Sequence, residues 1–260
     1  MSDLTYDALM DTTLLNGRVK LLQPKIGFHA SIDTVFLAAA VPLKKGMQLL
    51  DVGCGVGSAG LCVLARAADM SLHGISLSGL DAQEDLVNIA SRNAALNHDA
   101  KHSSFFAGNL LHEKLLPDNA FDTVMMNPPY QEAGTHTPSP EKIKAMSHGE
   151  DASGAALTDW VKYAHRKLTS GGALIMIHRA DRLDDIIAAL VGRRWFGSLV
   201  VQPLMSRTGD DAKRVIVTAR KERYSPMMLK SGFIIHEADG SYTAAAKAVL
   251  MDAQAIDLSR

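Results

Sequence analysis

The chain has 260 residues, of which 47% are hydrophobic and 21% are charged, and its formal net charge is −1 at pH 7. This length and hydrophobic content suit one domain with a sizeable core, with room for a small extension. The near-neutral charge excludes a wholly basic nucleic-acid-binding protein, but it leaves room for a local basic face.

Cysteine usage and the apolar runs point to a cytoplasmic protein. Cys54 and Cys62 have neither the spacing nor the neighbours of a zinc site, and they do not suggest a disulfide framework. Residues 1–13 are polar and acidic, unlike a signal peptide. The longest apolar runs are about ten residues, which is too short to span a bilayer. We therefore expect no membrane association, and no obligate protein partner is evident.

The first elements form an arm ahead of the main pattern. Residues 1–17 are a polar lead-in, and residues 17–33 predict a short hairpin or extended arm around Pro24 and Gly27. A helix over 33–41 follows, and Pro42 ends it.

Strands and helices then alternate for most of the chain, which predicts an α/β fold with helices on both faces of a sheet. The last two strands have no helix between them and suggest an antiparallel edge. The expected strands are 48–53, 75–82, 103–109, 121–127, 171–178, 197–205 and 214–222. The expected helices are 58–68, 83–97, 157–168 and 182–194, and residues 130–153 are expected to be a long loop.

The overall prediction is a doubly wound, mostly parallel, seven-stranded Rossmann-like sheet with an antiparallel edge strand. We divide the chain into an N-terminal arm and helix (1–45) and a main domain with a C-terminal tail (46–260).

A glycine-rich turn follows the first expected strand of the sheet. In an open α/β sheet, ligands bind beyond the carboxyl ends of the strands, and glycines let the backbone turn tightly and approach a ligand. The dinucleotide fingerprint would need a glycine where Ser58 stands, so the pattern is D-x-G-x-G-x-G instead. Its four defining residues are Asp51, Gly53, Gly55 and Gly57.

The next two strands end in polar residues. Asp81 can accept hydrogen bonds from both hydroxyls of a ribose, and the side-chain oxygen of Asn109 can accept one from an adenine amino group. Together, the three strand ends predict a cradle for an adenosine-bearing cofactor. A tight strand–helix turn with a capping acid is the simpler alternative.

The fourth strand stops at Asn127-Pro128-Pro129-Tyr130. Prolines fix their own φ and push the preceding residue into an extended conformation, so Asn127 is held rigidly. The Asn127 side chain and the Pro128 carbonyl offer acceptors to the two hydrogens of a planar amine, which would make its nitrogen a better nucleophile. Tyr130 can stack on the ring that carries the amine, a contact worth about 1–3 kcal/mol.

These motifs carry a resemblance. The stretches LLDVGCGVG, SGLDA and MMNPPY resemble the motifs of class I S-adenosylmethionine-dependent amino-methyltransferases. From about Arg18 to Met251, further stretches resemble one bacterial family, the tRNA1(Val) adenine-N6 methyltransferases and their relatives. These stretches are KLLQPKIGFHASIDTVFLAAAVP, MSHGE, IMIHRADRLDDI, VVQPLM and AKRVIVTARK.

The resemblance implies S-adenosylmethionine as cofactor and adenine in tRNA as acceptor. It implies that Asp51, Gly53, Gly55 and Gly57 line the methionine and ribose side, and that Asp81 holds the ribose. Asn127, Pro128, Pro129 and Tyr130 would be the catalytic residues around the target base. Asn109 departs from the Asp of many relatives, which keeps an acceptor but loses the charge. Asp33 is either a helix cap or a residue near the cofactor.

The stretch 193–223 is locally basic. Eight basic residues against three acidic ones give it a charge of +5. Its face is either a solvated edge or a surface for RNA phosphates. Lys25 and His29 are further candidates near the mouth of the pocket.

The loop after the Asn-Pro-Pro-Tyr motif contains His136, His148 and Glu150 without a compact metal-binding spacing, so we expect no metal. A mobile segment that closes over a flipped base is the alternative use of residues 131–153.

Three hypotheses follow. The first is a methyltransferase acting on adenine in RNA, most readily tRNA. The second keeps methyl transfer but changes the acceptor to a protein glutamine amide, another base or a small molecule. The third is a non-catalytic RNA-binding protein that senses S-adenosylmethionine.

Overall fold

A computed structural model describes residues 8–27, 29–129 and 154–259. Its main element is a nine-stranded sheet, and a separate two-stranded hairpin lies at the N-terminal side. The long strands of the sheet are β3 (Gln48–Val52), β4 (Ser76–Asp81), β5 (Ser103–Ala107), β6 (Phe121–Met126), β7 (Leu168–Arg179), β8 (Phe196–Met205) and β9 (Ala212–Lys221). The short strands are β10 (Met228–Leu229) and β11 (Phe233–Ile234).

The strand order confirms the doubly wound, mostly parallel α/β prediction. The seven long strands lie in the order β5-β4-β3-β6-β7-β9-β8, and those from β5 to β7 are mutually parallel. The order reverses between β3 and β6, which makes their carboxyl ends the switch point of the sheet.

Two details differ from the prediction. The sheet has nine strands rather than seven, because β10 and β11 both add to β8, and strands of two residues leave no hydrophobic pattern in a sequence. The antiparallel strand β9 lies between β7 and β8 instead of at the edge. After β8 the chain turns back, and β9 pairs with β8 on one side and with β7 on the other, so β9 joins β8 to the rest of the sheet.

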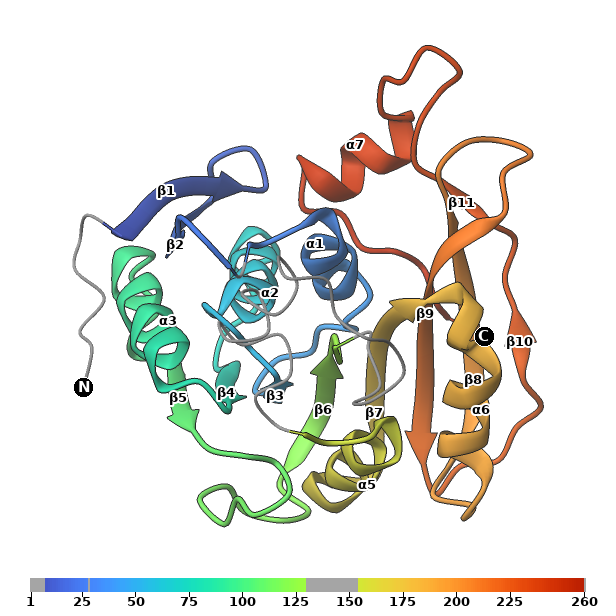
Figure 1. The fold of residues 1–260 in the computed structure, drawn as a ribbon, viewed down its shortest axis with the longest axis horizontal. Helices are drawn as coiled ribbons and strands as arrows, with labels where there is room; N and C mark the ends of the chain where they lie inside the picture. Colours follow the sequence, from blue (N-terminus) through green and yellow to red (C-terminus); the bar gives the residue numbers. More distant parts are fainter. Residues whose placement is uncertain (1–7, 28, 130–153, 260) are drawn as a thin grey trace, which may run out of the picture.

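Helices cover both faces of the sheet (Figure 1). Along β3, Leu49 joins one core cluster and its neighbour Leu50 joins the other, as expected for side chains that alternate across a strand. The first face carries α1 (Ile32–Ala39), α2 (Ser58–Asp69), α3 (Glu84–Leu96) and α7 (Ala244–Leu250). The second carries α5 (Leu157–Lys167) and α6 (Leu183–Val191), with the short 3-10 turn η2 (Ala180–Arg182) before α6. Among the described residues, none of these helices has the length and apolar character needed to cross a membrane.

The N-terminal arm is a hairpin of β1 (Leu9–Leu14) and β2 (Val19–Pro24). The sequence predicted a short hairpin or extended arm around Pro24 and Gly27; a hairpin is present, but Pro24 is the last residue of β2 and does not lie in its turn. The chain reverses earlier, over Leu15, Asn16 and Gly17, which all adopt positive φ. The hairpin and α1 share a core cluster with α2, and the division of the chain at residue 45 stays a prediction.

One buried amide joins the hairpin to the glycine turn. Asn93 of α3 is fully buried; its Oδ1 accepts from Leu22 N at 2.7 Å, and its Nδ2 donates to Leu22 O and Val56 O, both at 2.9 Å. Five apolar side chains pack around this lock, namely Leu9, Leu22, Val56, Leu86 and Ile89. The hairpin therefore covers and supports the turn after β3.

The C-terminal segment is tied to the core through a buried arginine. Arg66 of α2 donates to the carbonyls of Ala38, Val41 and Ala253. Burial lowers the pKa of Arg66 to about 10, so it stays protonated at neutral pH. This bonding and α7 were not predicted, because neither leaves a distinctive spacing in the sequence.

The Asn93 lock can be tested against Asn97, the residue that follows the last turn of α3. Asn97, one turn later and partly exposed, makes the same pair of bonds to the backbone of Lys20. We expect Asn93→Leu to lower the free energy of unfolding by about 3–5 kcal/mol, because three buried backbone groups lose their partners. Asn97→Leu should cost less than about 1 kcal/mol, because water replaces its bonds. Urea denaturation followed by circular dichroism measures both, and equal losses would contradict the role of Asn93.

Candidate active site at the switch point

The glycine turn and the Asn-Pro-Pro stretch are neighbours across the switch point. Asp51 and Val52 of β3 pair with Met125 and Met126 of β6, so the residues that follow the two strands emerge side by side. On the other flank of β3, Gly53 N donates to Leu80 O of β4 at 2.7 Å. The predicted convergence of these strand ends is therefore present in the fold.

Two glycines of the turn are required by the packing beneath them. Gly53 (φ +73°) and Gly57 (φ +80°) have a left-handed backbone conformation that residues other than glycine adopt only with strain. A Cβ on Gly53 would lie 2.8 Å from the ring of Trp160, and one on Gly57 would lie 3.1 Å from the ring of Phe105. The space beside the glycines is thus filled by an aromatic ring of α5 on one side and of β5 on the other.

Asp81 fixes the glycine turn from the end of β4. Its Oδ2 accepts from Gly55 N at 2.8 Å, and its Oδ1 accepts from Gln83 N at 2.9 Å. Burial raises the pKa of Asp81, while these backbone donors lower it by a smaller amount. Each carboxylate oxygen has a second lone pair, so the residue can still accept from a ligand hydroxyl.

Asp51 is a buried carboxylate with an unpaired oxygen. Its Oδ2 has no hydrogen-bond partner in the described part of the chain, and the residue is 2% exposed. Burial raises the pKa of Asp51 to about 7, the backbone of Gly60 lowers it, and the charge of Asp81 raises it further. Such a group favours a cation at this position.

Cys54 lies in the same turn, and burial together with the charges of Asp81 and Asp51 raises its thiol pKa, so it is not an activated nucleophile.

Asn109 begins the loop after β5. Its Oδ1 accepts from Leu111 N at 2.9 Å, and its backbone carbonyl accepts from the N–H groups of His112 and Glu113. The predicted adenine acceptor is therefore also the residue that shapes this loop. Gly108 N donates to Asp81 O, which keeps the loop beside the end of β4.

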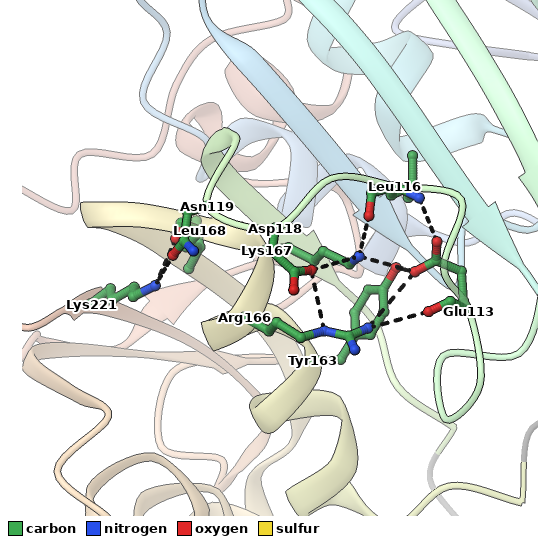
Figure 2. Close-up of polar contacts among 9 residues, drawn as sticks. All are labelled: Glu113, Leu116, Asp118, Asn119, Tyr163, Arg166, Lys167, Leu168 and Lys221. Carbon is green, nitrogen blue, oxygen red and sulfur yellow. Dashed lines mark hydrogen bonds and ion pairs between the residues drawn. The ribbon is translucent and has the colours of Figure 1, made fainter.

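A buried ion-pair network anchors that loop to α5 (Figure 2). The Glu113 side chain is fully buried; its Oε2 accepts from Tyr163 Oη at 2.5 Å and lies 3.2 Å from Lys167 Nζ. Lys167 Nζ also bonds Leu116 O and Asp118 Oδ1. Burial alone would raise the pKa of Glu113, but these bonds outweigh it and hold the pKa below its usual value. The stabilisation is present above the ordinary pKa of the carboxyl and is lost as the pH falls through the lowered one.

The catalytic candidates follow β6. Asn127 and Pro129 are half-buried and Pro128 is buried, while Tyr130 and the suggested lid of 131–153 lie outside the described residues, as do His136, His148 and Glu150. Beside them on β7, the next register positions after Met176 are Ile177 and His178. Within the described ranges, no group of three His, Cys, Asp or Glu residues is arranged to hold a metal ion.

The residues that the sequence placed near the cofactor or the mouth of a pocket are partly paired. Asp33 is not a helix cap, because Ser31 occupies that position; Asp33 Oδ2 accepts from Arg214 Nε of β9 at 2.8 Å. His29 Nε2 lies 3.1 Å from Pro24 O, and Lys25 is exposed.

A family model matches the part of the chain that carries these residues. Residues 29–143 match the family model of the methyltransferase small domain, and this range includes every site residue named above from Asp51 to Tyr130. The chain is an S-adenosylmethionine-dependent methyltransferase. Its cofactor is S-adenosylmethionine, and the class I fold expected from the sequence is confirmed.

Curated relatives carry the name tRNA1(Val) (adenine(37)-N6)-methyltransferase. The protein of Yersinia enterocolitica is 25% identical over 73% of this chain and 72% of its own length. That of Actinobacillus pleuropneumoniae is 23% identical over 86% of this chain and 89% of its own.

Solved structures show the same fold. A predicted O-methyltransferase of Agrobacterium tumefaciens has a TM-score of 0.68 at 25% identity, and the match covers 86% of this chain and 98% of that one. A tRNA methyltransferase of Aquifex aeolicus has a TM-score of 0.52 at 16% identity, covering 77% and 72% of the two chains.

The residues of this methyltransferase fit the cofactor. S-adenosylmethionine carries a sulfonium and an ammonium group, and the unpaired Oδ2 of Asp51 is complementary to a cation. Trp160, Phe105 and Glu113 were missed as supports of the site. Each has an ordinary place in a strand, helix or loop. Only the fold brings it beneath the edge of the sheet where the parallel strands end, which we call the cofactor edge.

Lys167 can be removed to test the network. We expect Lys167→Met to lower the free energy of unfolding by roughly 3–5 kcal/mol, because a buried carboxylate loses its cation. Lys162→Met, on the exposed face of the same helix, should change it by less than about 0.5 kcal/mol. Chemical denaturation of both variants measures the difference, and a neutral Lys167→Met would show that the other donors suffice for Glu113.

Cofactor affinity should depend on the ionisation of Asp51. Because the pKa of Asp51 is about 7, its carboxyl is protonated at low pH, and the affinity for the cation should rise as the pH increases through that value. Calorimetric titration with S-adenosylmethionine between about pH 5.5 and 7.5 tests this. Asp51→Asn should bind the cofactor about tenfold or more weakly, with an affinity that does not change with pH, whereas Asp85→Asn, at an exposed position of α3, should follow the wild type. A steep profile in Asp51→Asn would assign the titration to another group.

Proposed function

We propose that this methyltransferase transfers the methyl group to the exocyclic N6 amine of an adenine in RNA, with tRNA as the substrate class, in the cytoplasm. The observation that carries the proposal is the position of Asn127 and Pro128 directly after β6, next to the glycine turn across the switch point. The names of the curated relatives support the same acceptor.

The Asn127 side chain and the Pro128 carbonyl accept the two hydrogens of the amine and fix its orientation. The prolines contribute no N–H, so the strand end offers acceptors without competing donors. S-adenosylmethionine, when bound, supplies a methyl group on a positively charged sulfur.

The chain's own residues contribute positioning rather than acid–base chemistry. Asp81 and the glycine turn would hold one side of the site, and Asn127 and Pro128 would hold the amine. The methyl carbon would leave the sulfur as it bonds to nitrogen, which gives S-adenosylhomocysteine, and the methylated nitrogen would then lose one proton to water. Tyr130 is proposed to stack on the base, and Asn109 to accept from the adenine of the cofactor.

Asn127 variants test the proposal. Given methyl-labelled cofactor and total tRNA, Asn127→Ala should lose about 10²–10³-fold in kcat, because one preorganised partner of the amine is removed. Asn127→Asp keeps an acceptor and should lose less. Cofactor affinity should be unchanged in both variants, because Asn127 is proposed to contact the amine of the substrate and not the cofactor. Transfer at the wild-type rate in Asn127→Ala would contradict the amine-holding role.

The acceptor itself is identified by mass spectrometry of tRNA nucleosides from cells with and without the gene. Loss of N6-methyladenosine from one tRNA is the expected result. Label found in a glutamine amide or a small molecule would show a different acceptor, and RNA binding without S-adenosylhomocysteine formation would show a non-catalytic protein.

A further inference from the structure

The basic stretch of 193–223 is divided between opposite ends of the sheet. β8 and β9 are antiparallel, with Phe196 opposite Lys221 and Met205 opposite Ala212, so the middle and the ends of the stretch lie far apart. The middle, at the cofactor edge, has three basic residues against two acids, a charge of +1: Arg207, Lys213 and Arg214 with Asp210 and Asp211. The far end has five against one, a charge of +4: Arg193, Arg194, Arg220, Lys221 and Arg223 with Glu222.

Three arginines at the cofactor edge form ion pairs. Arg214 pairs with Asp33, Arg179 with Asp181, and Arg182 with Asp185. A guanidinium that already holds a carboxylate gains less from a phosphate, because one charged partner replaces another. Arg207 and Lys213 at this edge are exposed, but Asp210 and Asp211 lie between them in the sequence, so the net charge of this turn is small.

The far end presents a preformed group of arginines and aromatic rings. Arg193 lies over the ring of Trp195 at 5.4 Å, and that ring stacks on His165 at 5.5 Å. Arg194 lies over the ring of Tyr224 at 5.5 Å, and Tyr224 Oη donates to Arg194 O at 2.9 Å. These contacts orient two guanidiniums before any ligand arrives, which lowers the entropy lost on binding.

The remaining cations at this end differ in availability. Lys221 is buried and donates to Asn119 Oδ1 and Leu168 O, so it is not available to a partner. Arg220 and Arg223 are exposed and, in the described part of the chain, donate only to backbone carbonyls, those of Gly171 and Glu222. Within residues 8–27, 29–129 and 154–259, none of the four exposed arginines forms an ion pair. We define Arg193, Arg194, Arg220 and Arg223 as the distal arginine cluster.

We propose that the distal arginine cluster binds phosphates of the RNA substrate remote from the methylated adenine. This inference rests on the proposed function. Exposed guanidiniums without carboxylate partners match phosphate geometry, and Tyr224, which is 57% exposed, offers a ring for an unpaired base. β8 has ten residues, so the cluster lies about 30 Å from the cofactor edge at roughly 3.3 Å per residue. A substrate must be long enough to reach both ends.

Substrate length provides the test. We compare full-length tRNA with a short stem-loop that contains the target adenine but cannot span about 30 Å. The variant is Arg193→Ala with Arg194→Ala, and the control with the same change of charge is Lys45→Ala with Lys101→Ala, two exposed lysines elsewhere. Thermal unfolding verifies that each variant is folded.

For full-length tRNA, the double arginine variant should raise KM at least about tenfold with kcat and cofactor affinity unchanged. The slope of log affinity against log salt should become shallower by about 0.9 for each phosphate that the variant no longer binds. For the stem-loop, the KM of the double arginine variant should equal that of the wild type. Arg220→Ala with Arg223→Ala should act in the same direction, and the lysine control should leave both substrates unaffected.

Each alternative result is distinct. If the wild type methylates tRNA and the arginine variants change neither substrate, or change both equally, the distal cluster does not bind RNA and the inference is overturned. In that case an acidic protein would be the next partner for this surface. If the wild type methylates no RNA, the proposed function fails, and the inference fails with it.

Discussion

The pairing of β3 with β6, at the point where the strand order reverses, is the constraint on which the site depends. The ladder between these strands sets the register of Asp51 and Val52 against Met125 and Met126, and everything beyond the strands inherits that register. The glycine turn can meet Asn127 only because both strands end at the same height. A one-residue slip would also turn alternate side chains to the wrong face of a sheet that is buried on both sides.

Helix α5 supports two separate parts of the site. Its Trp160 fills the space under Gly53, and one turn later Tyr163 holds the carboxylate of Glu113 in the loop that Asn109 begins. The turn after β3 and the loop after β5 thus rest on one helix, although they belong to different strands. This explains why a buried lysine and a buried glutamate are tolerated here: each is fully hydrogen-bonded, and together they determine where the loop lies (Figure 2).

Sequence patterns predicted the parts of the fold that depend on regular spacing. Alternating strands and helices identified the doubly wound sheet, and the position of Asp51, Asp81 and Asn127 at strand ends identified the edge where they meet. The hairpin turn was misplaced, because Leu15 rarely adopts positive φ and the Asn16-Gly17 pair, which is typical of a hairpin turn, was not recognised.

Contacts between distant segments were beyond such patterns. Asn93 has the same appearance in a helix as Asn97, yet only Asn93 is buried against the glycine turn. The basic stretch was found from its composition, but its division between two ends of the sheet depends on the antiparallel return of β9, which the sequence placed at an edge.

The Asn93 bonds also set an order of assembly. Leu22 and Asn93 are 71 positions apart, so on the ribosome the hairpin and the glycine turn emerge well before the amide that joins them. A two-stranded hairpin is marginally stable alone in water, and long-range closures are the slow steps of folding. The cofactor turn therefore acquires its final shape only after α3 has been synthesised, and nascent chains that end before α3 should not bind the cofactor.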